Sequence, residues 1–88
     1  MYTLYTVAGM ECQYCERAER LLAENLVEYE IIEADRNDEN DPYWRLFKTN
    51  RWSTVPQIVK GGIHIGGYTD LVQHFRTGHY KSRRYEEV

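Results

Sequence analysis

The sequence has few cysteines, no long apolar run and no strong excess of charge of either sign. Only two of its 88 residues are cysteine, whereas small secreted domains stapled by disulfides typically carry about four or more. No segment approaches the roughly 18 consecutive apolar residues of a membrane-spanning helix. The net charge of -3 leaves no general basic face for phosphate contacts. These absences exclude a disulfide-stapled scaffold, a membrane-spanning helix and a general nucleic-acid binder.

The start of the chain shows no pattern of a secretory signal. Residues 1–7 alternate polar and apolar side chains instead of joining a basic start to an apolar block. We therefore expect a cytoplasmic protein, acting as a monomer, that binds neither a membrane nor a nucleic acid. The one basic cluster, Lys81, Arg83 and Arg84, lies in the tail, and we interpret it as a solvated terminus.

Side-chain periodicity predicts seven elements, because alternation is typical of strands and apolar residues three or four apart are typical of helices. The predicted order is a strand at 1–7, a helix from residue 13 with the apolar stripe Cys15, Ala18, Leu22 and Leu26, a strand at 27–34, a short helix at 42–50, strands at 57–60 and 63–66, and a helix at 68–77. Asp41-Pro42 is a helix-start signal, and Gly61-Gly62 suits a tight antiparallel hairpin.

This order of elements predicts an α/β fold with a four-stranded mixed β-sheet flanked by three helices. It is the minimal thioredoxin-like architecture. At this length we expect one domain over residues 1–88, with a core of about 2–77 and a tail of about 79–88.

Cys12 and Cys15 form a Cys-x-x-Cys pair at the start of the first predicted helix. Two thiols at this spacing can close into a disulfide and reopen, so that electrons pass through one site in pairs. Cys12 lies just ahead of the helix, where free N–H groups and the helix dipole lower the pKa of a thiol. Cys15 lies one turn further on, within the apolar stripe. We therefore predict Cys12 as the exposed nucleophile and Cys15 as the less exposed resolving thiol.

Two other interpretations of this pair are half of a zinc site and two unrelated structural cysteines. A tetrahedral zinc site needs two further ligands. The three histidines, His64, His74 and His79, show no paired spacing that would supply them. Redox chemistry is therefore the favoured interpretation, and no metal is expected.

Three separated motifs make the chain similar to the glutaredoxins. They are Cys12-Gln13-Tyr14-Cys15, Thr54-Val55-Pro56 and Gly66-Gly67-Tyr68-Thr69-Asp70-Leu71. Any one of them is a weak signal, whereas the set in this order and spacing is a strong one. The resemblance covers residues 2–77 and implies the glutaredoxin version of the thioredoxin fold. It also implies glutathione as the reductant and bound co-substrate.

The resemblance further implies roles for residues around the cysteines. A cis bond before Pro56 would present the backbone N–H and C=O of Val55 to the cysteinyl part of glutathione. Thr69 and Asp70, which are also ordinary helix-capping residues, would hold the γ-glutamyl end. The full set of cofactor-binding candidates is Tyr14, Lys48, Arg51, Thr54, Val55, Pro56, Gly67, Thr69 and Asp70.

The charges near the thiols depart from the usual glutaredoxin pattern. Many members have a lysine or arginine a few residues before the first cysteine, where this chain has Ala8, Gly9 and Glu11. A glutamate beside a thiol raises the pKa of that thiol. We expect Lys48 and Arg51 to substitute for the missing cation and to hold the glycyl carboxylate of glutathione.

The resulting prediction is a glutathione-dependent oxidoreductase that reduces protein disulfides and glutathione mixed disulfides. One alternative is a glutaredoxin-like redoxin that takes electrons from thioredoxin reductase and serves ribonucleotide reductase. Another is iron–sulfur cluster binding by a glutathione-ligated dimer, because Gln13 stands where the commonest dithiol glutaredoxins have proline. Turnover with thioredoxin reductase tests the first alternative, and visible absorbance of anaerobically purified protein tests the second.

Overall fold

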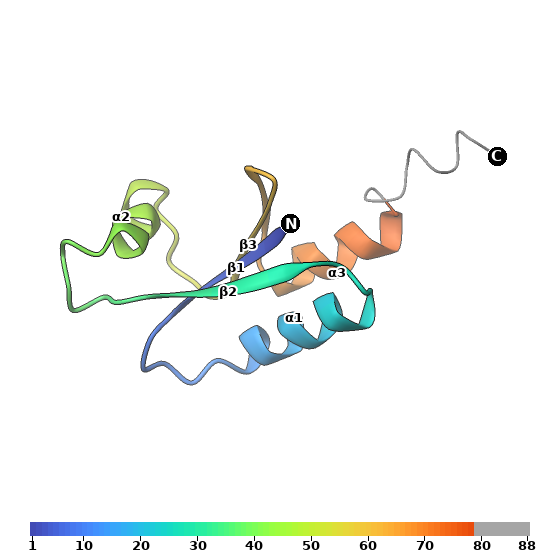
Figure 1. Cartoon of the computed structure of the whole chain (residues 1–88), viewed down its shortest axis with the longest axis horizontal. Coiled ribbons are helices and arrows are strands. Elements are labelled where there is room, and N and C mark those ends of the chain that lie inside the picture. Colours follow the sequence, from blue (N-terminus) through green and yellow to red (C-terminus); the bar gives the residue numbers. More distant parts are fainter. Residues whose placement is uncertain (79–88) are drawn as a thin grey trace.

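The computed structural model describes residues 1–78, so the predicted basic cluster of the tail lies outside the described residues. The elements in order are β1 (Tyr2–Val7), α1 (Gln13–Glu24), β2 (Tyr29–Ala34), α2 (Pro42–Thr49), β3 (Gln57–Lys60), β4 (Ile63–Gly66) and α3 (Tyr68–Thr77) (Figure 1). The strands form one mixed sheet in the order β2-β1-β3-β4. β1 pairs with β2 in parallel and with β3 antiparallel, and β3 pairs antiparallel with β4. The predicted fold class is confirmed.

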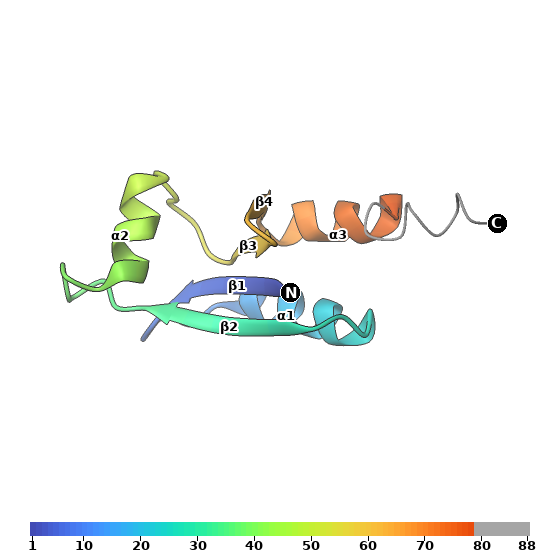
Figure 2. The same ribbon diagram turned by 45° about the horizontal axis from the view of Figure 1, so that its top comes forward.

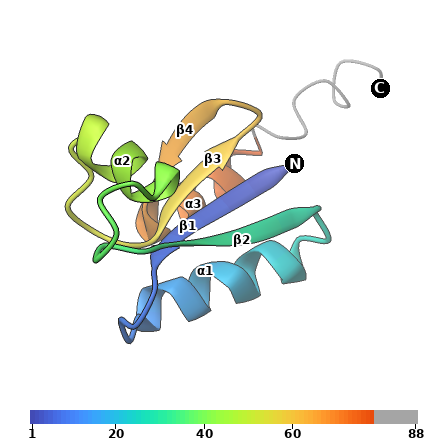
Figure 3. The same ribbon diagram turned by 60° about the vertical axis from the view of Figure 1, so that its left-hand side comes forward.

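The helices cover both faces of the sheet, and each face has its own hydrophobic cluster. Helices α1 and α3 lie on one side of the strands and α2 lies on the other (Figures 2 and 3). The cluster under α1 and α3 consists of Tyr2, Leu4, Ala18, Leu22, Ile58 and Leu71. The cluster under α2 consists of Val7, Ala34 and Phe47. Each large apolar side chain buried in this way contributes roughly 1.5–3 kcal/mol, so packing on both faces holds the ends of β1 and β3 in place.

The start and stop signals of the sequence act where they were predicted. Asp41 caps α2, because its side chain accepts a hydrogen bond from the N–H of Trp44 at 3.2 Å. Gly61 and Gly62 form the β3–β4 turn with positive φ angles of 54° and 85°. Gly78, which directly follows the helix predicted at 68–77, ends α3 in the left-handed conformation. Among residues 1–78, no helix combines the length and the apolar character needed to cross a membrane.

The first helix ends earlier than its apolar stripe predicts. Helix α1 stops at Glu24, and Leu26 has a φ of 58° and a side chain that is 92% exposed. A left-handed residue cannot continue a right-handed helix, so the chain turns there toward β2. β2 begins at Tyr29 rather than at Val27. The inclusion of Leu26 in the buried stripe is therefore wrong.

Candidate functional site

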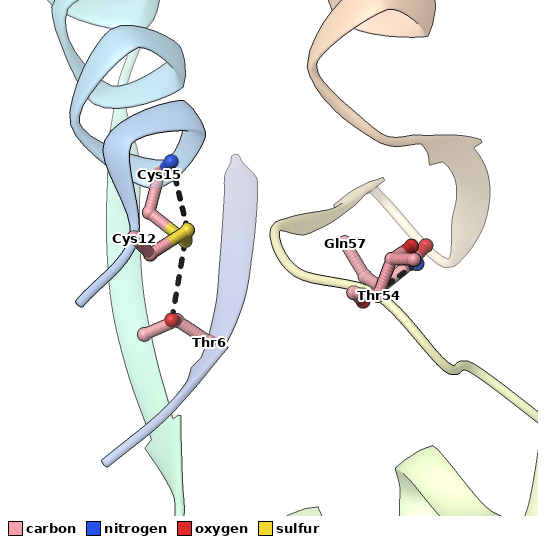
Figure 4. Close-up of a disulfide and its surroundings, with 5 residues drawn as sticks. All are labelled: Thr6, Cys12, Cys15, Thr54 and Gln57. Atoms are coloured by element: carbon pink, nitrogen blue, oxygen red, sulfur yellow. Dashed lines mark hydrogen bonds between the residues drawn. A yellow bond between two sulfur atoms is a disulfide. The ribbon is translucent and has the colours of Figure 1, made fainter. Parts of the chain in front are cut away.

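The two cysteines form a disulfide at the N-terminus of α1 (Figure 4). Cys12 is the N-cap residue, and its sulfur accepts a hydrogen bond from the backbone N–H of Cys15 at 3.0 Å. The first amides of a helix have no intrahelical partners, and their dipoles favour a negative charge at this position. When the disulfide is reduced, these groups stabilise a thiolate on Cys12. The local geometry thus supports the predicted division of roles between the cysteines.

Cys15 is distinguished by its contact with β1. Thr6, on the buried side of β1, has its Oγ1 3.2 Å from the sulfur of Cys15 (Figure 4). Because a disulfide sulfur carries no proton, the threonine hydroxyl donates this hydrogen bond. Both cysteines are half-buried, so burial does not distinguish them as an exposed Cys12 and a less exposed Cys15. Thr6 was not predicted from the sequence, where its signal was a polar residue on the same inward side of the strand as Leu4.

One groove beside the disulfide lies between α1 and β2, and we call it the acidic groove. It has a volume of about 740 Å³ and is lined by both cysteines. Four glutamates line it as well, namely Glu11, Glu16, Glu19 and Glu33, and no lysine or arginine of the described chain does. Carboxylates near a thiol oppose its ionisation. The helix N-terminus therefore favours ionisation of the Cys12 thiol, whereas the glutamates of the acidic groove oppose it.

A second groove, of about 470 Å³, lies on the other side, toward β3 and the start of α3, and we call it the loop groove. Its lining brings together eight of the nine predicted cofactor-binding residues: Tyr14, Arg51, Thr54, Val55, Pro56, Gly67, Thr69 and Asp70. Lys48 does not line it and lies exposed in the last turn of α2. The structure therefore brings Arg51, and not Lys48, to the groove.

Val55 lines the loop groove and has backbone groups that are unpaired within the described chain. The Val55–Pro56 peptide bond is cis, as the resemblance implied. Within residues 1–78, neither the N–H nor the C=O of Val55 has a hydrogen-bond partner. An unpaired donor and acceptor on one residue can pair with an extended peptide as an added strand does.

Helix α3 begins at the edge of the loop groove. Gly67 is its N-cap residue and donates its N–H to Oδ2 of Asp70 at 3.0 Å. Gly66 has a φ of +127°, and a Cβ at this position would collide with the carboxylate of Asp70. A Cβ on Gly67 would lie 3.6 Å from the carbonyl oxygen of Pro56, which is an ordinary contact. The backbone thus requires glycine at position 66, whereas a side chain at position 67 could be accommodated.

Gln57 and His64 were not among the cofactor-binding residues predicted from the sequence. Gln57 on β3 and His64 on β4 both line the loop groove. Gln57 is a buried polar residue, 6% exposed, directly after Pro56 in an otherwise apolar segment. That position next to a motif was the signal that could have identified it.

Comparison with known proteins relates the chain to one family. The sequence model of the glutaredoxin family matches residues 2–65. The chain is 38% identical over 68 residues to glutaredoxin 1 of Rickettsia prowazekii, covering 77% of this chain and 70% of that protein. It is 37% identical over 68 residues to glutaredoxin 1 of Rickettsia typhi, covering 77% of this chain and 64% of that protein. The chain thus spans about two thirds of the length of these relatives.

Solved structures show the same relationship. The crystal structure of a buckwheat glutaredoxin–glutathione complex is 28% identical with a TM-score of 0.67, covering 88% of this chain and 69% of that chain. The solution structure of glutaredoxin from Brucella melitensis is 32% identical with a TM-score of 0.67, covering 92% of this chain and 84% of that chain. The chain, with its Cys12–Cys15 disulfide, therefore belongs to the glutaredoxin family of thiol–disulfide oxidoreductases.

Proposed function

We propose that this glutaredoxin transfers electrons from glutathione to protein disulfides and to glutathione mixed disulfides. The observation that carries the proposal is Val55, which lines the loop groove and whose N–H and C=O are unpaired within residues 1–78. Glutathione is a short peptide whose cysteinyl residue offers a complementary N–H and C=O. The buckwheat glutaredoxin, which this chain resembles, forms a complex with glutathione.

The charged ends of glutathione match the remaining residues of the loop groove. Its γ-glutamyl carboxylate suits the first-turn amides of α3 near Thr69. Asp70, which already accepts a hydrogen bond from Gly67, offers negative charge to the neighbouring ammonium group. Arg51 is the cation of this groove and binds the glycyl carboxylate. Backbone pairing at Val55 and these charges together orient the glutathione sulfur toward Cys12.

The chemistry proceeds by thiol–disulfide exchange. The Cys12 thiolate attacks one sulfur of the substrate disulfide, forms a mixed disulfide with it and releases the other sulfur as a thiolate. For a protein disulfide, the Cys15 thiolate then attacks the Cys12 sulfur, closes the Cys12–Cys15 disulfide and releases the second substrate thiolate. Two glutathione thiols reopen this disulfide and leave as glutathione disulfide. The reduction potentials of glutaredoxins are roughly -200 to -230 mV, so a cytosolic glutathione pool can reduce them.

The cellular setting and partners follow from this chemistry. A disulfide that must be reduced again after each turnover requires a reducing compartment, and we propose the cytoplasm. The substrates would be proteins with accessible disulfides, ribonucleotide reductase among the candidates, and the protein would act as a monomer of one domain. The loop groove favours glutathione over thioredoxin reductase as the electron donor, because its residues match a small charged peptide.

Single replacements of the two cysteines test the proposal. In glutathione-coupled reduction of a glutathionylated peptide, we expect Cys12→Ser to lose at least about 100-fold in kcat/KM, since the nucleophile is gone. Cys15→Ser should retain this activity but lose reduction of a protein disulfide that contains no glutathione. Activity that survives in Cys12→Ser and disappears in Cys15→Ser would reverse the assigned roles. Faster turnover with thioredoxin reductase than with glutathione would show that thioredoxin reductase, and not glutathione, is the electron donor.

A further inference from the structure

We propose that Gln57, oriented by His64, is a positioning residue that aims the backbone N–H of Val55 at glutathione. This inference rests on the proposed function, because it concerns how the loop groove is held in its binding geometry. The two residues come from neighbouring strands and form a chain of hydrogen bonds that ends at Thr54. Neither residue belongs to the three motifs that relate the chain to its family.

The side-chain amide of Gln57 is anchored on Thr54. Its Nε2 donates to the backbone carbonyl of Thr54 at 3.0 Å and to the Oγ1 of Thr54 at 3.2 Å. Figure 4 shows the Gln57 side chain meeting Thr54, across β1 from the disulfide. Gln57 is 6% exposed, and a buried amide is costly unless its donors and acceptor are paired. The buried amide of Gln57 therefore needs its hydrogen bonds to Thr54, which is itself exposed.

The direction of the hydrogen bonds follows from the Thr54 carbonyl. A carbonyl oxygen only accepts, so the nitrogen end of the Gln57 amide must face it. The oxygen end then faces His64, whose Nε2 lies 2.7 Å from Oε1 of Gln57. Because that oxygen also only accepts, Nε2 of His64 carries a proton. His64 thus donates to Gln57, and Gln57 donates to Thr54. This order excludes the flipped orientation of the Gln57 side-chain amide.

The anchored carbonyl controls the neighbouring N–H group. The C=O of Thr54 and the N–H of Val55 belong to one peptide group, which is planar. Within residues 1–78 the cis bond is at Val55–Pro56, so the Thr54–Val55 peptide is trans and its C=O and N–H point in opposite directions. Holding the carbonyl toward Gln57 therefore holds the Val55 N–H away from Gln57. This is the N–H that lacks a partner within the described chain.

His64 is held in place by aromatic packing. Its ring stacks on Trp52 with a centroid distance of 5.0 Å and an interplanar angle of 26°. Trp52 in turn meets the buried ring of Phe47 edge to face at 5.2 Å, and it packs against Tyr5 at 5.8 Å. Burial, and then the charges of Tyr43 and Glu30, raises the pKa of Tyr5 above its ordinary 10.0, so this ring stays neutral. The hydrophobic cluster under α2 thus holds His64 in position to donate its hydrogen bond to Gln57.

Loss of this network should affect glutathione recognition and not the reactivity of the thiol. The disulfide and its partners Thr6 and the Cys15 N–H lie outside the network. Without Gln57, the Thr54–Val55 peptide can rotate and the Val55 N–H loses its fixed direction. The KM for a glutathionylated substrate should then rise while kcat stays nearly constant.

The experiment uses one peptide carrying a mixed disulfide either with glutathione or with 2-mercaptoethanol. For the glutathione form, we expect Gln57→Leu and His64→Phe to raise KM about threefold to tenfold, as expected for loss of one or two hydrogen bonds, with kcat within twofold. His64→Phe retains an aromatic ring to stack on Trp52 but removes the donor. Gln73→Leu, an exposed glutamine outside the loop groove, is the matched control and should change neither constant.

The two forms of the peptide separate the possible failures. A wild-type protein with equal kcat/KM for both forms would overturn the proposed glutathione function. A wild-type protein that prefers the glutathione form, with Gln57→Leu and His64→Phe keeping the full preference, would overturn the positioning role alone. If Gln57→Leu does not fold, the exposed His64→Phe variant decides the question by itself. An equal loss of kcat for both forms would also overturn the positioning role, since it would place the defect in the thiol chemistry.

Discussion

The Cys12–Cys15 disulfide has the acidic groove on its β2 side and the loop groove on its β3 side. The acidic groove is lined by both cysteines and four glutamates, with no lysine or arginine of the described chain in its lining. The loop groove contains Arg51, the start of α3 and the unpaired backbone groups of Val55. Glutathione carries two carboxylates and one ammonium group at neutral pH and is therefore an anion. This difference supports the proposal that glutathione binds in the loop groove, although both cysteines line the acidic groove and neither lines the loop groove.

The two grooves exert different kinds of control over the disulfide. The loop groove offers directional contacts, namely backbone pairing, a helix N-terminus and one cation, which are suited to binding. The acidic groove offers charge without such contacts and opposes ionisation of the thiols. Binding and thiol reactivity should therefore respond to different substitutions.

The largest effect is expected at Gly66, which shapes the loop groove. Gly66→Ala must keep a φ of +127° and brings a Cβ onto the carboxylate of Asp70. We expect it to destabilise the protein by about 1–3 kcal/mol and to raise the KM for a glutathionylated peptide, because Asp70 is displaced. Gly62→Ala is the control, with a φ of +85° and nothing within 4 Å of the added Cβ. Equal losses of stability in urea unfolding would show that the Asp70 contact is unimportant.

An intermediate effect is expected for the cation of the loop groove. Arg51→Gln should raise the KM for a glutathionylated peptide about twofold to fivefold, since exposed ion pairs contribute modestly. Lys48→Gln removes the same charge three residues earlier but outside the groove, and it should leave KM unchanged. The Arg51 effect should shrink as salt is added. Steady-state kinetics that show equal increases for both variants would contradict a specific contact.

The smallest effect is expected in the acidic groove. Glu11→Gln removes a carboxylate beside Cys12 and should increase the thiolate fraction of Cys12 at neutral pH. In a reduced Cys15→Ser background, we expect alkylation by iodoacetamide to accelerate by about twofold, a size typical of exposed charges. Glu24→Gln, at the far end of α1, is the control and should have no effect. An unchanged or slower rate in Glu11→Gln would mean that this groove does not control the thiol.

Most of the fold was predictable because its signals are local. Alternation in β1, the Asp41-Pro42 helix start and the Gly61-Gly62 turn each act through neighbouring residues, and the structure confirms all three. The failure at Leu26 has a physical reason. Its side chain continues the apolar spacing of α1, but its backbone has already left the helix, and a side-chain pattern does not report backbone conformation.

The site was only partly predictable. The motif residues Tyr14, Val55 and Asp70 meet in the loop groove as their family resemblance implied. Arg51 and Lys48 could not be distinguished by charge. Arg51 lines the groove because it follows the end of α2 in a left-handed conformation with a φ of 56°, whereas Lys48 still belongs to the helix.

The sequence by itself determined the order of the elements, the placement of Cys12 at the start of a helix and the identity of the family. The first two properties depend on residues that are close together along the chain, and the family identity depends on three short motifs whose order and spacing can be read directly from the sequence. The tertiary structure alone decided that Thr6 donates to Cys15, that His64 and Gln57 anchor Thr54, and that the two grooves differ in charge. Each of these contacts depends on how strands pair and on which helix covers which face of the sheet. Strand pairing and packing join residues that are far apart in sequence, so no local pattern could report them.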